Sequence, residues 1–342
     1  MDLDMCYLWL TPLGPDAPAG PVQPLLTPKD APYFFDVDIE FRAAGERRFE
    51  IDGLPVRVVL QVLDGLVLLA ECRYTLADGL DGPAVARKRA LHAALRERLQ
   101  IETGSSVGLF EGYTVVLMRQ APPTPDEFVD ANAVALASLL RSLTKPLDQR
   151  DAAEILAARA RYSAHDLTVI DWDGALVIAE DGDYQSDIEL LKIGNYQLLR
   201  LRLIDQDIEA SLRALRDSVE RARPNLARAR SWLPTPNRTL QAVVQQRLEL
   251  LLEFEKIDQS LLLIGDWYSA RAYRLIVEQF YLADWKAAVS ARLNSLADID
   301  TIVSQRLAFS WQRVLEFIQF AGWLILLVGY FVLFFVDLTR PR

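Results

Sequence analysis

The stretch Leu167-Thr-Val-Ile-Asp-Trp-Asp-Gly-Ala-Leu-Val-Ile178 predicts a strand, a tight turn and a second strand. Its two outer runs are rich in β-forming residues, and the Asp-Trp-Asp-Gly between them is typical of a hairpin turn. We therefore predict a β-hairpin near the middle of the chain, and we expect the surrounding sequence to complete a domain that contains both strands and helices.

The residues before this hairpin predict further strands and a helix. Asp64-Gly65 is a hairpin signal between two runs of β-forming residues. Pro83 is typical of the first position of a helix, which we expect to end at about Ile101. The runs that predict strands are Met5 to Leu10, Phe35 to Phe41, Val56 to Val62, Leu66 to Tyr74 and Tyr113 to Met118.

Two capping boxes predict where later helices begin. In each of them, a Thr or Ser is followed three residues later by a Glu that can bond back to the start of the helix. Thr124 opens a helix that we expect to end at about Leu143, and a second helix is expected over Asp151 to Tyr162. Ser186 opens a long helix soon after the hairpin.

The change from strands to helices predicts an α+β fold class with two regions. Residues 1–182 are expected to form an α/β domain, and residues 183–316 a helical coiled-coil hairpin or stalk. Apolar residues recur every three or four positions in this second region, from Leu201 to Val219 and again from Leu293 to Phe317.

A proline-rich loop interrupts the first region at residues 11–34. Its prolines recur every third residue, which places them on one edge of a polyproline II segment. Either a docking site for a partner or a solvated loop is compatible with this spacing. The prolines are Pro12, Pro15, Pro18, Pro21 and Pro24.

The C-terminal part of the chain contains an uncharged run of 20 residues, Phe317 to Val336. A helix of this length spans roughly 30 Å, which is the hydrocarbon thickness of a bilayer. Its phenylalanines make it apolar on every side. We therefore predict one C-terminal transmembrane helix and a tail-anchored protein, with a buried core helix as the alternative.

The N-terminus does not resemble a signal peptide, because Asp2 and Asp4 are acidic and the apolar run beside them is short. We therefore expect a single-pass protein of the bacterial inner membrane whose N-terminal domain lies in the cytoplasm. The presence of only two cysteines is compatible with a reducing compartment.

The charge balance argues against nucleic acid as a partner. Lys plus Arg number 37 against 47 for Asp plus Glu, a net charge of −10, whereas non-specific binding of nucleic acid needs a basic surface. One basic patch stands out, and it could contact anionic lipid, an acidic protein or RNA, or simply face solvent. Its central residues are Arg221, Arg223, Arg228 and Arg230.

Seven acidic residues between Asp171 and Glu189 raise the question of a cation site. Carboxylates are ligands of calcium and magnesium, but they also suit tight turns and the positive end of a helix. The sequence from Asp181 to Asp187 does not match the pattern of a calcium-binding loop. We therefore expect no metal and no cofactor, and the alternative is a cation site formed by Asp171, Asp173, Asp181, Asp183 and Asp187.

No motif predicts a catalytic residue. Gly104-Ser-Ser-Val-Gly108 matches the G-x-S-x-G pattern of hydrolases, but a predicted helix precedes it where that motif requires a strand. The common nucleotide-binding, zinc-protease and redox-cysteine motifs do not occur in the sequence. We therefore expect a protein that is not an enzyme.

Several segments carry a resemblance to known families. The hairpin and Ile193-Gly-Asn-Tyr-Gln-Leu-Leu-Arg-Leu-Arg-Leu-Ile-Asp205 resemble a set of uncharacterised prokaryotic membrane proteins. The helical part is similar to the membrane-anchored family required for meiotic nuclear division. The residues that carry this likeness are Asp266-Trp-Tyr-Ser-Ala-Arg-Ala-Tyr273, Arg292-Leu-Asn-Ser-Leu296 and Leu315-Glu-Phe-Ile318. The resemblance covers roughly residues 165–336 and implies a scaffold or tether at a membrane.

These features predict a tail-anchored membrane scaffold or sensor, without enzymatic activity, that self-associates through its helical stalk. We expect a homo-oligomer whose further partners are the membrane and a protein of unknown identity. One alternative is divalent-cation transport or sensing of the CorA type, although such channels have two spans and only one is predicted here. The other is a membrane-associated enzyme of unassigned chemistry.

Overall fold

The computed structural model describes residues 1–14, 21–23, 39–105, 108–121, 123–145, 147–221, 252 and 267–338. Two compact units can be distinguished by their internal contacts. The first comprises Met1–Asp205 with Leu252–Val289, and the second comprises Gln206–Leu251 with Ser290–Arg342. The first unit therefore continues beyond the predicted boundary at residue 182, because later helical segments complete its packing.

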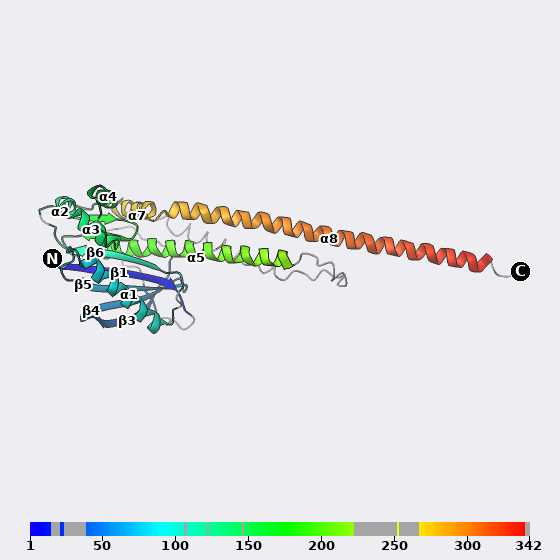
Figure 1. Ribbon diagram of the computed structural model, residues 1–342, viewed down its shortest axis with the longest axis horizontal. Helices are drawn as coiled ribbons and strands as arrows, with labels where there is room; N and C mark the ends of the chain where they lie inside the picture. Colours follow the sequence, from blue (N-terminus) through cyan, green and yellow to red (C-terminus); the bar gives the residue numbers. More distant parts are fainter. Residues whose placement is uncertain are drawn as a thin grey trace. The chain divides into compact units, whose positions relative to one another are not determined.

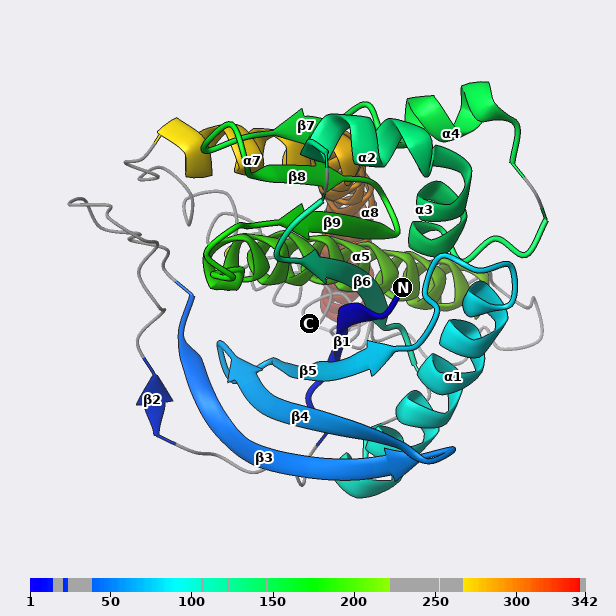
Figure 2. The ribbon, with the colours of Figure 1, turned by 90° about the vertical axis from the view of Figure 1, so that its left-hand side faces the viewer.

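The strands of the described residues form one mixed sheet in the order β2-β3-β4-β5-β1-β6-β9-β8-β7 (Figure 2). Neighbouring strands are antiparallel except β6 and β9, which are parallel. The strands are β1 Leu3–Pro12, β2 Val22–Gln23, β3 Phe41–Ile51, β4 Leu54–Leu63, β5 Val67–Leu76, β6 Glu111–Met118, β7 Arg159–Ala160, β8 Leu167–Ile170 and β9 Gly174–Ile178.

Both predicted hairpins are confirmed. The loop between β4 and β5 consists of Asp64, Gly65 and Leu66, and the first two have φ angles of 52° and 66°. Asp and Gly accept this left-handed conformation readily. The predicted hairpin of residues 167–178 pairs β8 with β9, so that Ile170 lies opposite Ala175. Of the predicted strand Phe35 to Phe41, residues 35–38 lie outside the described residues, and β3 begins at Phe41.

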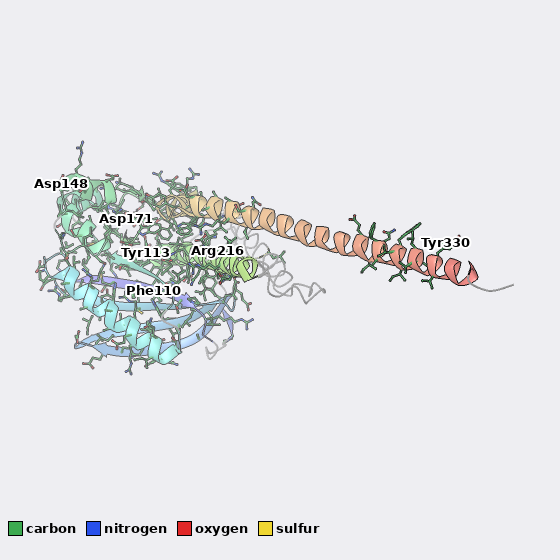
Figure 3. The ribbon with its side chains drawn as sticks, turned by 45° about the vertical axis from the view of Figure 1, so that its right-hand side comes forward. Phe110, Tyr113, Asp148, Asp171, Arg216 and Tyr330 are labelled. Atoms are coloured by element: carbon green, nitrogen blue, oxygen red, sulfur yellow. The ribbon has the colours of Figure 1, made fainter. Side chains whose placement is uncertain are left out.

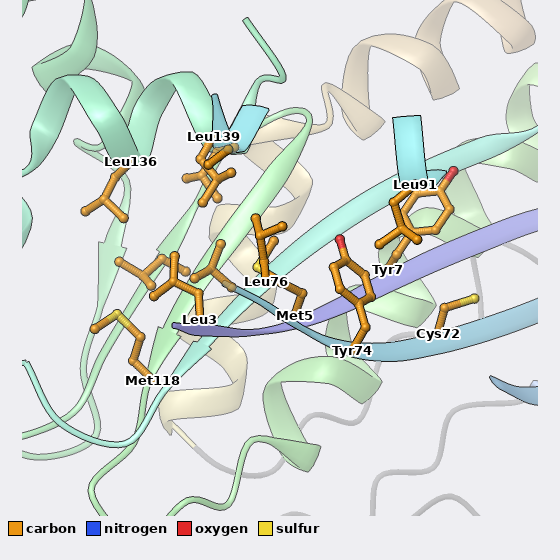
Figure 4. Packing of buried hydrophobic residues seen from close by; sticks show 14 of the residues in the cluster. Leu3, Met5, Tyr7, Cys72, Tyr74, Leu76, Leu91, Met118, Leu136 and Leu139 are labelled. Atoms are coloured by element: carbon orange, nitrogen blue, oxygen red, sulfur yellow. The ribbon is translucent and has the colours of Figure 1, made fainter. Parts of the chain in front are cut away.

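One face of the sheet carries four helices and the main hydrophobic core. Figure 4 shows this core, in which Tyr7 and Tyr74 from the sheet lie near Leu91 of α1. The predicted helix after Thr124 begins as expected, since the Thr124 hydroxyl accepts the backbone N–H of Glu127, but it is interrupted at Asn132. The four helices are α1 Ala84–Thr103, α2 Pro125–Ala131, α3 Ala133–Leu140 and α4 Gln149–Ile155.

The opposite face of the sheet carries the first part of α5, Gln185–Arg221. Its side chains reach several strands: Lys192 bonds to Glu71 of β5, and Arg202 pairs with Glu111 of β6. Helix α7, Trp267–Gln279, packs against β7, β8 and α5. The close approach of α7 to α5 depends on Gly194, because a Cβ atom there would lie 2.3 Å from Cγ2 of Ile276.

We expect Gly194→Val to lower the free energy of unfolding by about 1–3 kcal/mol, as overpacking of a close-packed interior does. The Ile276 side chain is only 1% exposed and therefore cannot move aside into solvent. The matched control is Gly82→Val, because no atom lies within 4 Å of a Cβ built at Gly82. Urea unfolding followed by circular dichroism measures both, and equal midpoints for the two variants would contradict this packing.

The last part of the predicted helical stalk is divided into two helices. Tyr281, with a φ of 52°, separates α7 from α8, Leu282–Leu338. No Gly or Pro marks this break in the sequence, and the Tyr281 backbone adopts the left-handed conformation without either residue. Residues 222–251 and 253–266 of the predicted stalk lie outside the described residues.

The predicted transmembrane helix is wrong, and with it the part of the fold class and the tail anchor that depended on it. Within the described ranges, no helix is both long enough and apolar enough to cross a membrane. Phe317 to Val336 form the last part of α8, a continuous helix of 57 residues (Figure 1). The uncharged run does not form a helix of its own, because it continues a helix whose preceding turns carry charged residues.

Candidate functional site

A small pocket lies where β8, the segment before α5 and the start of α7 meet. Its volume is about 70 Å³. Thr168 contributes from β8, Asp187 from the first turn of α5 and Tyr268 from α7. Three further acidic residues line it, namely Asp166, Asp181 and Asp183.

Asp187 is the central group of this pocket. Its Oδ1 atom accepts a hydrogen bond from the Tyr268 hydroxyl at 2.6 Å and another from the Thr168 hydroxyl at 3.1 Å. The two hydroxyl oxygens lie 3.0 Å from each other. All three side chains are buried, so the carboxyl group is held in one position by donors from two other elements.

The electrostatics of the pocket favour a neutral carboxyl group. Burial raises the pKa of Asp187 to about 6, and the nearby charges of Asp166 and Asp183 act in the same direction, although the hydrogen bonds from Tyr268 and Thr168 oppose it. Burial and the Asp187 carboxylate raise the pKa of Tyr268 as well, so the phenol keeps its proton. The arrangement can therefore take up or release one proton near pH 6.

We expect Asp187 to make the domain more stable as the pH falls from 7 to 4. Its pKa is higher in the folded than in the unfolded chain, so this contribution is fully present below about pH 4 and is lost as the pH rises through about 6. From the size of the shift, the change is on the order of 2–3 kcal/mol. Thermal unfolding of the wild type and of Asp187→Asn between pH 4 and pH 7 measures how much their stabilities differ at each pH.

The control for this experiment is Asp151→Asn, a change of the same chemical kind at an exposed position of α4. Its unfolding profile should follow that of the wild type. If the unfolding temperatures of the wild type and of Asp187→Asn change with pH by the same amount, Asp187 does not titrate in this range.

The structure brings together three of the five aspartates of the predicted cluster. Asp181, Asp183 and Asp187 line the pocket, whereas Asp171 and Asp173 lie in the turn between β8 and β9. In the described part of the chain, no group of three or more His, Cys, Asp or Glu side chains is placed to hold a metal ion. The spacing in the sequence alone could not separate these two groups.

Asp171 has a structural environment of its own. Only 1% of it is exposed, and its carboxylate accepts two hydrogen bonds from the Arg141 guanidinium, both of 2.8 Å. The Tyr113 hydroxyl donates to its backbone carbonyl at 2.9 Å, and both residues are labelled in Figure 3. Burial, followed by the Asp171 charge, raises the pKa of Asp173. These contacts hold the hairpin turn against α3 and β6.

Most of the predicted arginine patch lies outside the described residues. Arg221 is the last residue of α5, while Arg223, Arg228 and Arg230 lie outside the described residues. The predicted hydrolase motif is also only partly described. Gly104 ends α1 with a φ of 63°, so a helix does precede the motif, as the sequence indicated.

Two clusters of buried ionisable side chains were not indicated by the sequence. Lys192 of α5 forms ion pairs with Glu189 of the same helix and with Glu71 of β5. On the other face of the sheet, Nε2 of His92 lies 2.7 Å from the Tyr74 hydroxyl oxygen, and burial holds the pKa of His92 well below its ordinary value. Glu189 is a local partner, three residues before Lys192 on α5, but Glu71 lies on β5 and the partners His92 and Tyr74 lie on different elements.

The fold and this pocket define an α+β protein with a mixed sheet and a long C-terminal helix. Residues 46–185 match the family model described as the N-terminal domain of the uncharacterized protein MJ0711. The uncharacterized protein MJ0711 of Methanocaldococcus jannaschii is 23% identical over 206 residues, which are 60% of this chain and 61% of that protein. The chain thus matches less than two thirds of the relative's length. No solved structure matches the chain.

These comparisons support the coarser part of the predicted resemblance, a likeness to an uncharacterised prokaryotic family. They contain nothing that refers to tail anchoring or to meiotic nuclear division. The matched residues 46–185 run from within β3 through β9 and end at the start of α5. The similarity to this family model therefore concerns the sheet and the helices that cover one face of it.

Proposed function

We propose that this protein is a non-enzymatic scaffold or sensor that self-associates through the C-terminal part of α8. The observation that carries the proposal is a run of large apolar side chains, each more than half exposed, along this part of the helix. Figure 3 shows them projecting from the helix around Tyr330. They are Ile318, Phe320, Trp323, Leu324, Ile325, Leu326, Leu327, Val328, Tyr330 and Val332.

These side chains surround the helix. Six consecutive exposed residues, from Trp323 to Val328, turn through more than one full helical turn, because an α-helix has about 3.6 residues per turn. A helix that is apolar on all sides is normally buried, and soluble monomers rarely expose contiguous apolar patches of more than a few hundred Å². We infer that other chains cover this surface.

A second copy of this chain is the partner that this surface fits best. The stretch Phe317 to Val336 contains no charged residue that could select a partner of complementary charge. An identical helix provides an equally apolar surface of the same length, and helices that pack around a shared apolar core form bundles. Symmetric self-association is also the commonest form of assembly among proteins.

The pocket around Asp187 supports the sensing part of the proposal. A carboxyl group with a pKa of about 6 changes its charge in response to a small change of pH. It also joins α7 to α5 and β8, since its hydrogen-bonding partners belong to α7 and β8. The absence of enzymatic activity, the localisation, the partners and the likeness to the meiotic division family stay predictions.

Light scattering coupled to size exclusion tests self-association directly. In a mild detergent and at micromolar concentration, we expect a mass of two or more copies that falls towards one copy on dilution. A monomer over the whole concentration range would contradict the proposal.

A further inference from the structure

Three arginines lie opposite one another on neighbouring strands of the sheet. Arg48 of β3 is directly opposite Arg57 of β4, and Arg57 is directly opposite Arg73 of β5. Residues paired in this way point to the same face, and neighbouring strands are about 4.8 Å apart. The three positive charges therefore cross the sheet in a row, and we refer to them as the arginine row.

Like charges in directly opposite positions destabilise a sheet unless they are compensated. Arg57 donates two hydrogen bonds to Glu46, of 2.8 and 3.1 Å. Arg73 donates to Glu71 at 2.7 Å and to Gln185 at 3.1 Å. Arg48 is exposed, and no carboxylate among the described residues forms an ion pair with it. The Glu46 carboxylate, which Arg57 already engages, also interacts with the charge of Arg48, so the three arginines share the two carboxylates of Glu46 and Glu71.

The arginine row lines a groove of about 570 Å³ on the face of the sheet where α5 begins. Asp4 and Thr75 bond to each other in its lining, and Leu117 and Tyr184 provide an apolar and an aromatic surface. Of the four charged residues in the lining, three are the arginines and one is Asp4. A volume of this size is typical of sites for small molecules, which are about 300–1,000 Å³.

We propose that this groove binds a small ligand carrying two or more phosphate groups. Guanidinium groups bind phosphate oxygens through paired hydrogen bonds, and they do so in a fixed planar geometry. A ligand with several negative charges also matches a row that extends over two strand spacings. Such a ligand would relieve the repulsion within the row. Inorganic pyrophosphate and the polyphosphate of a nucleotide share this chemistry.

The proposal is independent of self-association, because every residue of the groove belongs to the first compact unit and none lies in α8. The test is titration calorimetry of the full chain with inorganic pyrophosphate and, separately, with ATP. We expect saturable binding of at least one of them. Tighter binding of ATP would assign the groove to nucleotides, and equal binding would assign it to the phosphates alone.

Arg48→Gln is the informative variant, because it removes a charge without breaking an ion pair among the described residues. We expect it to weaken binding about tenfold or more, as the loss of a charge-assisted hydrogen bond does. The matched control is Arg89→Gln, at an exposed position of α1 on the opposite face of the sheet. It should bind the ligand as the wild type does.

Three outcomes would overturn the proposal. The first is no binding of either ligand at millimolar concentration. The second is equal weakening by Arg48→Gln and Arg89→Gln, which would indicate a general effect of charge. The third is that a short single-stranded RNA competes with both ligands and binds more than tenfold more tightly than either of them. This result would assign the groove to a nucleic-acid polymer. Unchanged thermal unfolding of both variants would confirm that the fold is intact.

Discussion

Lys192→Met is expected to destabilise the first compact unit by about 3–5 kcal/mol, the usual cost of removing one partner from a buried ion pair. The ammonium group of Lys192 lies 2.7 Å from Glu71 Oε2 and 2.9 Å from Glu189 Oε1. Glu71 and Glu189 are each only 6% exposed. Methionine fills nearly the same volume, so the loss would come from the two buried carboxylates rather than from a cavity.

The protonation of these groups supports this expectation. Burial opposes the charge on Lys192, but the carboxylates of Glu189 and Glu71 outweigh it and raise the pKa of the lysine. Burial also opposes the charge on Glu71, but Lys192 and Arg73 hold its pKa below the ordinary value. Without Lys192, the ion pair that Glu71 keeps among the described residues is the one with the partly exposed Arg73.

Urea unfolding at neutral pH measures this loss. The matched control is Lys145→Met, the same chemical change at an exposed position, which should alter stability by less than about 0.5 kcal/mol. Adding Glu71→Gln and Glu189→Gln to Lys192→Met should restore part of the stability, because the uncompensated charges are then removed. If Lys192→Met and Lys145→Met unfold at the same urea concentration, the ion pairs do not contribute as described.

The second large effect concerns α8, where Ile325→Asp should weaken self-association by about a hundredfold or more. Ile325 is 72% exposed within one chain. Burying such a side chain between chains contributes roughly 1.5–3 kcal/mol, and a symmetric dimer loses this contribution in both copies. An aspartate there would also have to lose its hydration, which adds to the cost.

The measurement is the dissociation constant from light scattering over a dilution series. Asn294→Asp introduces the same charge at an exposed position in an earlier part of α8, and it should leave the constant unchanged. The thermal unfolding of the first compact unit should be the same for both variants. A dissociation constant for Ile325→Asp equal to that of the wild type would show that this part of α8 is not the interface.

The sequence was a reliable guide where a structure depends on neighbouring residues. Asp64-Gly65 forms its turn because these two residues tolerate left-handed backbone angles. The Thr124 hydroxyl accepts the N–H of Glu127 because three residues span the first turn of a helix. The uncharged run after Phe317 is helical as predicted, although no helix of the described ranges meets the requirements of a membrane span.

The candidate site and the groove depend instead on contacts between distant residues. Asp187 and Tyr268 are 81 positions apart, and neither has a motif around it that indicates the other. The arginine row exists only because the strand register places Arg48 and Arg73 on either side of Arg57. A shift of one residue in the pairing would move these side chains to the other face.

By itself, the sequence determined the hairpin turns, the start of α2 at Thr124 and the apolar character of the last part of α8, because these follow from backbone preferences and side-chain polarity. The Ser186 capping box does not mark the start of α5, which begins at Gln185. Only the tertiary structure decided the parallel pairing of β6 with β9, the break at Tyr281 and the burial of Lys192 between two carboxylates. The physical reason is that burial, register and pairing are properties of two or more segments at once, whereas each local pattern is compatible with several neighbours.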